Sequence, residues 1–368
     1  MKVVWKRIEE IKPGEILGDD VYDSKSFVLL LQKGSVLSKE DIEQLKDRKI
    51  IWVPIKLEER EEKVGEEELE SAETALVESS ILISEELPPT IPEDIYDDYI
   101  SSVSNLINNM KSGIKIEVSG ITSVCSEVVE MIRKSKEHIL NLFTAHTMGY
   151  LRKHLVNTSI MAVMIGSVMK LPRHRLISLA KVGLVHDIGW TFIYKDFPDV
   201  MDVGDVPENL MKFHPIASVR IIMKYTESFL ASDEVEAILH HHERYDGKGF
   251  PFGVSGKRIN ELARILQFAD VFDTLTSDAM KDRKFTPYHA TKWIINRTGM
   301  CFDPDIAKHF FKLTGIYPTG TKVRLSDGRV GLVVRANPDA PMKPVVRLKD
   351  TQIDLSKVND IWIEKVEE

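Results

Sequence analysis

The sequence predicts a mainly α protein, in which an all-helical central domain is flanked by a small α/β domain and a small β-rich domain. Apolar residues recur with the helical period of about 3.6 through most of residues 92–316. The flanking segments instead contain short runs of alternating or β-branched residues, separated by Gly, Pro and Asn turns. All 11 histidines lie between His138 and His309. Histidine chemistry therefore belongs to the helical region.

Residues 1–56 are expected to form a small α/β domain with a regulatory role. Residues 3–8 and 27–31 have the composition of strands, and a further β-rich run covers residues 49–55. Ser38 begins a capping sequence that predicts the start of a helix.

Residues 57–91 are rich in Glu and poor in aromatic residues, which predicts an exposed acidic linker or helix. Prolines end this segment, and a new helical stretch is expected from Glu93. We expect connecting helices over residues 92–139 and the chemistry-bearing domain over residues 140–316.

Residues 317–368 are expected to form the small β-rich C-terminal domain, with no catalytic set of its own. Its pattern predicts an antiparallel sheet with strands over residues 322–325, 330–335, 344–348 and 360–363.

The bulk composition limits the function. The 368 residues are 43% hydrophobic and 29% charged, as in an ordinary globular protein. The net charge of −8 argues against a nucleic-acid partner, which would require a basic surface. The N-terminus lacks a signal-peptide pattern, and no apolar run in the sequence is long enough to insert in a membrane, so a cytoplasmic protein is expected. Cys125 and Cys301 do not form a thiolate motif, so any metal is held by His and carboxylate.

Histidine and aspartate residues lie at inward positions of the predicted helices. His154 lies at the edge of an apolar stripe, and His186 and Asp187 close a helix that Gly189 is placed to end. His214 directly precedes a proline, which suits the first turn of a helix that follows it.

Two further segments add candidate ligands. The helix signal at Ser232 leads into three consecutive histidines, of which His241 and His242 continue or flank the apolar stripe. His240 is predicted to point away, to the surface. Asp270 lies on the inward face of the next helix, with Asp273 one turn later.

Together these residues predict a site for two divalent metal ions without thiolates. Such a site suits iron, with manganese and nickel as alternatives. Two cations with a bridging hydroxide as nucleophile would hydrolyse a phosphoester. The seven predicted metal ligands are His154, His186, Asp187, His214, His241, His242 and Asp270.

Several ordered motifs resemble the HD-GYP branch of the HD phosphohydrolase superfamily. The run His186-Asp187-Ile188-Gly189 is followed by a segment from His241 to Pro251, with Phe250 in place of the usual Tyr. Blocks at residues 263–277 and 299–304 are similar to the next two motifs of the family, and the resemblance covers about residues 140–316.

The resemblance implies an all-helical HD-type domain from a bacterial signalling system that hydrolyses cyclic di-GMP to linear pGpG, or further to GMP. It assigns metal ligation to the same seven residues, with Asp187 as the bridging ligand and His186 and Asp187 as the catalytic pair. In the family, the loop containing Gly249, Phe250 and Pro251 is associated with a protein partner. A homodimer is expected from the amphipathic helix before His138.

This chain departs from the family pattern in two places. Tyr150 stands where many members have a Glu that supports a third metal, and a phenol is a poorer ligand at neutral pH. We therefore predict two metals. Trp190 stands where the family often has a Lys that pairs with the substrate phosphate.

Other residues are candidates for contacts with the cyclic dinucleotide, because they are charged or aromatic side chains near the motifs. They are Lys195, Tyr245, Asp246, Lys248, Phe250, Asp273 and Arg283.

Two alternatives to the phosphodiesterase stay open. One is an HD phosphohydrolase of another cyclic dinucleotide or nucleotide. The other is a metal-containing cyclic di-GMP sensor with little catalytic activity, which the replacements at Tyr150 and Trp190 favour. The seven-ligand set favours the enzyme, because binding alone does not require an activated water.

Overall fold

The chain forms two compact units in a computed structural model. One unit contains Pro88–Thr319, and the other contains Met1–Leu87 with Gly320–Glu368. The structure describes residues 3–18, 21–22, 29–48, 50, 52–56, 91–134, 149–193, 206–277, 285–349 and 351–367. The predicted acidic linker lies, apart from residue 91, outside the described residues. The domain boundaries expected from the sequence remain predictions.

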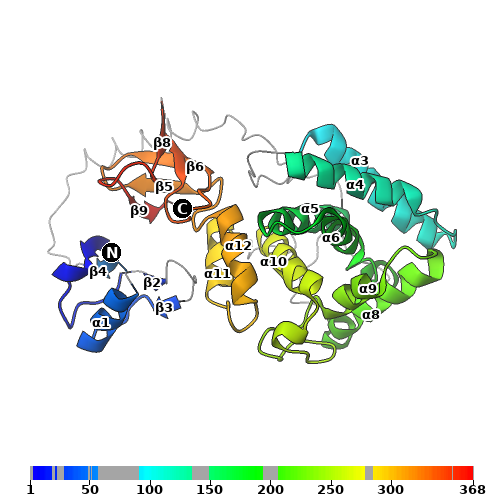
Figure 1. The fold of residues 1–368 in the computed structure, drawn as a ribbon, viewed down its shortest axis with the longest axis horizontal. Coiled ribbons are helices and arrows are strands. Elements are labelled where there is room, and N and C mark those ends of the chain that lie inside the picture. Colours follow the sequence, from blue (N-terminus) through cyan, green and yellow to red (C-terminus); the bar gives the residue numbers. More distant parts are fainter. Residues whose placement is uncertain are drawn as a thin grey trace. The chain divides into compact units, whose positions relative to one another are not determined.

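The unit Pro88–Thr319 is helical, and with the small C-terminal sheet it confirms the predicted fold class (Figure 1). Its helices are α3 (Glu93–Lys111), α4 (Ser119–Lys134), α5 (Tyr150–Val168), α6 (Arg173–Val185), α7 (Trp190–Ile193), α8 (Glu208–Tyr225), α9 (Ser232–His240), α10 (Glu261–Thr276), α11 (Pro287–Ile295) and α12 (Pro304–Thr314).

Helix α5 is the centre of this unit. It is buried on nearly all sides from Leu155 to Gly166, as expected of a helix that is apolar around its whole circumference. It packs against α3, α4, α6, α10 and α12, and Figure 1 shows α5, α6 and α10 side by side. Gly183 permits the close approach of α6, because a Cβ there would lie 2.5 Å from the Cα of Ser159.

The start of α8 differs from the sequence prediction. Pro215 lies inside the helix rather than in its first turn, because α8 begins at Glu208. Proline lacks the N–H that would bond to the residue four positions earlier, but burial of the apolar face of α8 keeps the helix continuous. His214 therefore projects from the middle of a helix.

The prediction for His240 is wrong. Its side chain is buried, and its Nδ1 accepts a hydrogen bond from the backbone N–H of Asn260 at 3.3 Å. The ring of Phe252 lies edge-on at 6.0 Å between ring centres. The loop between α9 and α10 folds back over this histidine, which the pattern of α9 alone could not indicate.

The described part of the N-terminal segment contains two antiparallel strand pairs, a short 3-10 helix (Ile8–Glu10) and one α-helix. β1 (Val3–Arg7) pairs with β4 (Trp52–Lys56), and β2 (Val21–Tyr22) pairs with β3 (Leu29–Leu31). Helix α1 (Lys39–Asp47) begins at the predicted capping box, in which the Ser38 hydroxyl accepts from the backbone N–H of Asp41. Residues 27–28, the start of one predicted strand, lie outside the described residues.

The C-terminal segment forms a five-stranded antiparallel sheet in the order β8-β7-β6-β5-β9. Three strands lie where the sequence predicts them, whereas β8 was not predicted and β9 begins at the last residue of the predicted run 360–363. Residues 360–362 of the predicted run therefore precede β9 and are not part of the strand. The strands are β5 (Lys322–Leu325), β6 (Val330–Arg335), β7 (Val345–Arg347), β8 (Gln352–Asp354) and β9 (Ile363–Val366).

One segment among the described residues has the length and composition of a membrane span. It is Arg173–Ile193, which contains α6 and α7. In the structure, 61% of its most apolar window is buried inside the protein. Since α6 packs against α4, α5, α9 and α10, its hydropathy is that of a core helix.

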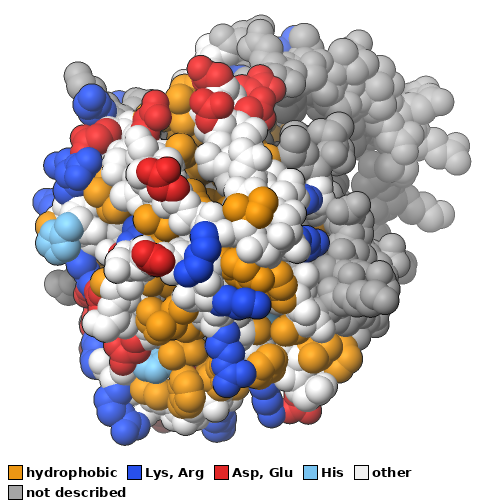
Figure 2. Space-filling view, turned by 90° about the vertical axis from the view of Figure 1, so that its right-hand side faces the viewer, with side chains coloured by type: hydrophobic (Ala, Val, Ile, Leu, Met, Phe, Trp, Pro, Cys, Tyr) orange, Lys and Arg blue, Asp and Glu red, His pale blue; other side chains and the backbone are white. Residues whose placement is uncertain are grey.

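The surface of the molecule is mixed in character on the face shown in Figure 2. Basic side chains lie among apolar ones over the lower part of this face, and acidic side chains gather toward its top.

Candidate metal centre

The seven predicted ligands come from five places in the helical unit and meet at one point. His154 lies in α5, His186 caps the C-terminus of α6, and Asp187 lies in the turn that follows. His214 lies in α8, and Asp270 lies in α10. His241 caps the end of α9, and His242 follows it. Their possible ligand atoms form three overlapping groups, and within each group these atoms lie within 4.8 Å of one another. The first group is Asp187, His214, His241 and His242. The second is His154, His186 and Asp187, and the third is His186, His241 and Asp270.

A close backbone approach brings α8 to the turn after α6. A Cβ at Gly189 would lie 2.5 Å from the backbone nitrogen of Ser218, so only glycine fits there. The N–H of Gly189 donates to the Ser218 hydroxyl at 2.9 Å. This contact places His214 of α8 beside Asp187, and the ring of Trp190 stacks on His214 at 4.4 Å.

Acceptors behind three of the imidazoles determine which ring nitrogen faces the site. The Nδ1 of His186 lies 2.9 Å from the carbonyl of Gly183, and the Nδ1 of His241 lies 2.6 Å from the carbonyl of Ile238. The Nδ1 of His154 lies 2.8 Å from the Asp273 carboxylate. Each Nδ1 therefore donates its proton outward, which leaves the Nε2 lone pair directed into the cluster.

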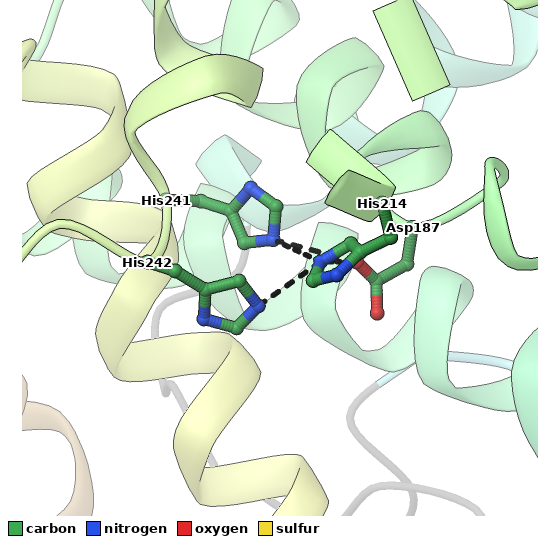
Figure 3. A group of neighbouring side chains, drawn as sticks. All are labelled: Asp187, His214, His241 and His242. Carbon is green, nitrogen blue, oxygen red and sulfur yellow. Dashed lines mark hydrogen bonds and ion pairs between the residues drawn. The ribbon is translucent and has the colours of Figure 1, made fainter. Parts of the chain in front are cut away.

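The Asp187 carboxylate lies between two sets of imidazoles. Its Oδ1 is 3.0 Å from His214 Nε2 and 3.4 Å from His241 Nε2. Its Oδ2 is 3.8 Å from the Nε2 atoms of both His154 and His186. Figure 3 shows Asp187 facing His214, His241 and His242. One oxygen thus faces each set.

The protonation of the cluster also suits a cation. Burial lowers the pKa of His186 to about 4, so its imidazole is neutral at neutral pH. Burial alone would raise the pKa of Asp187, but His186 and His214 hold it well below its ordinary value. Burial also lowers the pKa of His154, but Tyr150 and the carboxylates of Asp270 and Asp273 raise it well above its ordinary value. The centre therefore contains a buried carboxylate and, at His186, a neutral imidazole.

Unpaired nitrogen atoms show that these residues fit a metal. The Nε2 of His214 lies 3.2 Å from that of His241 and 3.1 Å from that of His242, so three ring nitrogens converge there. The buried Nε2 of His186 has no hydrogen-bond partner among the described residues. Buried polar atoms without partners are costly, and a divalent cation would satisfy them together.

The loop after His242 folds over one side of the centre. Glu243 is buried, and its carboxylate accepts backbone N–H bonds from Phe252, Gly253 and Val254 at 2.7 to 3.0 Å. The ring of Phe250 lies 4.8 Å from the His242 ring. Glu243, which the sequence analysis missed, therefore anchors the loop that carries Phe250.

The other predicted substrate contacts on this loop lie at its outer part. Asp246 and Lys248 are exposed, and the Asp246 carboxylate binds the Arg244 guanidinium at 2.7 Å and the backbone N–H of Lys248. The backbone N–H of Tyr245 donates to the carbonyl of Cys301. Lys195 and Arg283 lie outside the described residues.

Asp273, another predicted substrate contact, lies behind His154. It is 4% exposed, and its oxygens accept from His154 Nδ1 and from the Asn157 side-chain amide, each at 2.8 Å. The sequence analysis missed Asn157, although it lies one helical turn after His154 and so shares its face.

Tyr150 packs against the same imidazole without acting as an acceptor for it. Its ring stacks on His154 at 5.2 Å, and its hydroxyl lies 3.4 Å from the Thr274 hydroxyl. Burial raises the pKa of Tyr150 to about 12.

Two stretches of the chain match models of known domain families. Residues 127–306 match the model of the HD domain, and residues 322–368 match that of the KOW domain associated with the HD domain. The helical part of the chain is therefore similar to the HD domain over residues 127–306.

Several curated relatives of the chain are named as cyclic di-GMP phosphodiesterases. The chain is 27% identical to cyclic di-GMP phosphodiesterase PA4108 of Pseudomonas aeruginosa over 67% of this chain and 60% of the relative. It is 26% identical to cyclic di-GMP phosphodiesterase PdeB of Borreliella burgdorferi over 51% of this chain and 50% of that one. It is 35% identical to the cyclic di-GMP phosphodiesterase response regulator RpfG of Xanthomonas campestris over 35% and 34%. The matches thus span between about a third and three fifths of these relatives.

Proposed function

We propose that the protein is a metal-dependent phosphodiesterase of the HD-GYP type, which hydrolyses cyclic di-GMP to linear pGpG. The observation that carries the proposal is the placement of Asp187, whose two carboxylate oxygens face two separate sets of imidazoles. The names of the relatives supply the substrate class.

The ligands divide into two sets that share Asp187. One set is His154, His186, Asp187 and Asp270, since His154 Nε2 lies 3.3 Å from Asp270 Oδ1. The other is Asp187, His214, His241 and His242. We propose two divalent cations, iron in the first place, with manganese or nickel as alternatives. The buried Tyr150, whose hydroxyl faces Thr274, does not supply a third site.

When bound, two such cations supply a hydroxide nucleophile and neutralise the charge of the phosphate and of the leaving ribose oxygen. The protein's own residues orient the ligand imidazoles and shield them from water. His186, His241 and His154 keep their Nε2 lone pairs inward through their Nδ1 acceptors. The rings of Trp190 and Phe250 cover His214 and His242 and limit the access of water to them. Hydrolysis would break one ribose O–P bond and open the ring.

The test is to purify the protein anaerobically, measure metal per chain, and follow cyclic di-GMP turnover on the same sample. Two metals per chain with pGpG as product are expected. A panel with a mixed GMP-AMP cyclic dinucleotide and mononucleotides tests the substrate class, because preference for another member would overturn cyclic di-GMP as substrate.

The replacement of the phosphate-pairing Lys by Trp190 favours one other function, that of a cyclic di-GMP sensor. Trp190 is 2% exposed and stacks on His214, so it brings no charge to a substrate phosphate. Full metal occupancy with tight nucleotide binding and no turnover would establish the sensor and reject the enzyme.

A further inference from the structure

A chain of hydrogen bonds runs from helix α3 to the metal ligand His154. The Tyr96 hydroxyl on α3 donates to the side-chain oxygen of Asn157 at 2.9 Å. The amide nitrogen of Asn157 donates to Asp273 Oδ1 at 2.8 Å, and Asp273 Oδ2 lies 2.8 Å from His154 Nδ1. All four side chains are buried, with exposures of 1% to 7%.

Each link determines the direction of the next. Because an ionised carboxylate only accepts, the amide nitrogen of Asn157 faces Asp273 and the amide oxygen faces Tyr96, whose hydroxyl is therefore the donor. Asp273 then accepts from both sides, which keeps the proton of His154 on Nδ1 and its Nε2 lone pair toward Asp270 and Asp187. The ring of Tyr150 stacks on His154 at 5.2 Å between ring centres and packs against one face of the imidazole.

We infer that Tyr96 is a positioning residue for metal binding, acting on His154 through Asn157 and Asp273. The inference rests on the proposed function for the identity of the bound group. Tyr96 lies before residues 127–306, the part of the chain that matches the HD domain. The support of a metal ligand thus extends to a helix outside that match.

Helix α3 offers a matched control. Tyr99 lies on the same helix, is fully buried, and loses the same hydroxyl on substitution by Phe. Its hydroxyl lies 2.8 Å from the hydroxyl of Ser159, which donates to the carbonyl of Ala180. The hydrogen bonds from Tyr99 therefore lead to Ala180 on α6 and do not reach Asp273.

The experiment measures the Mn²⁺ dissociation constant and stoichiometry by calorimetric titration of the full chain stripped of metal. Tyr96→Phe is expected to raise the Mn²⁺ dissociation constant of the weaker of the two binding steps about fivefold, which is the effect of one lost hydrogen bond. Asp273→Asn should weaken it about 10- to 100-fold, the usual effect of removing the partner of a ligating histidine. Tyr99→Phe should bind Mn²⁺ as the wild type does.

A double variant separates positioning from general damage to the fold. In Asp273→Asn protein the chain is already broken, so adding Tyr96→Phe should leave the Mn²⁺ affinity unchanged. Thermal midpoints of the metal-free variants show whether each is folded, and Asn157→Ala interrupts the chain at another link should Tyr96→Phe unfold the protein.

The possible failures are distinct. Equal Mn²⁺ affinity for Tyr96→Phe and Tyr99→Phe, or additive losses in the double variant, would overturn the role of Tyr96 and leave the proposed enzyme intact. Mn²⁺ binding by the wild type without cyclic di-GMP hydrolysis would overturn the enzyme and leave the role of Tyr96. A wild type that binds no Mn²⁺ would overturn both.

Discussion

The two halves of the candidate metal centre are held by different means. The half around His154 is supported by hydrogen bonds, in which Asp273 and Asn157 hold the imidazole from behind. In the half around His214, rings cover two of the imidazoles, since Trp190 stacks on His214 and Phe250 lies against His242, and the acceptor behind His241 is a backbone carbonyl. Asp187 belongs to both halves, because one of its oxygens faces each set of imidazoles.

This difference follows from where the residues come from. The first half is built mainly on α5 and α10, two packed helices of the core, so side chains one helical turn apart can support one another. The second half combines α8 with residues that follow the end of α9, where a loop must be held in place.

The largest effect is expected from Asp187→Asn, which breaks the link between the halves. An amide keeps the shape but loses the charge shared by both sets of imidazoles, so metal per chain should fall from two to at most one. Cyclic di-GMP turnover should fall by more than about 100-fold. This exceeds the usual loss on mutating a residue that only hydrogen-bonds to a metal ligand. Metal analysis and a turnover assay measure both values.

Asp339→Asn is the matched control, because Asp339 is exposed on the C-terminal sheet unit. Two metals and normal turnover in Asp187→Asn would show that Asp187 does not join two cations.

A smaller effect, confined to the half around His214, is expected from Glu243→Gln. The carboxylate accepts three backbone N–H groups of the loop, and an amide would place its own N–H against at least one of them. We expect a loss of about 2 kcal/mol in the free energy of unfolding, the typical result of leaving buried charge-assisted bonds unmade. Phe250 would no longer be held against His242.

Denaturant titration measures this loss, and steady-state kinetics measure KM and kcat. KM should rise about tenfold while the metal content stays at two per chain. Glu236→Gln, an exposed change on α9, is the control for stability. Loss of metal without a change in stability would place Glu243 in a role other than that of loop anchor.

The smallest effect is expected from Tyr150→Phe, in the half around His154. The ring continues to stack on the imidazole, and the lost hydroxyl makes only a 3.4 Å contact with Thr274. Metal content should be two per chain in the wild type and in the variant at both pH 7 and pH 9, because burial raises the pKa of Tyr150 to about 12 and the wild-type phenol keeps its proton over this range. Metal analysis that finds three metals in the wild type and two in the variant would make Tyr150 a ligand.

The sequence alone determined the fold class and the set of residues that meet in the centre. His186 and Asp187 follow an apolar helix, and Asp270 lies on an inward helical face, so local periodicity was sufficient to direct them to one interior. The capping box at Ser38 and most strands of the C-terminal sheet also follow from local rules.

Only the tertiary structure decided the remaining features. Pro215 lies within α8 and His240 is buried, because packing of α8 and the loop after α9 outweighs local preference. Tyr96, Asn157 and Asp273 are far apart in sequence, and no spacing rule links a tyrosine on α3 to an aspartate on α10. Contacts between distant elements depend on how the helices pack, which the period of each helix does not contain.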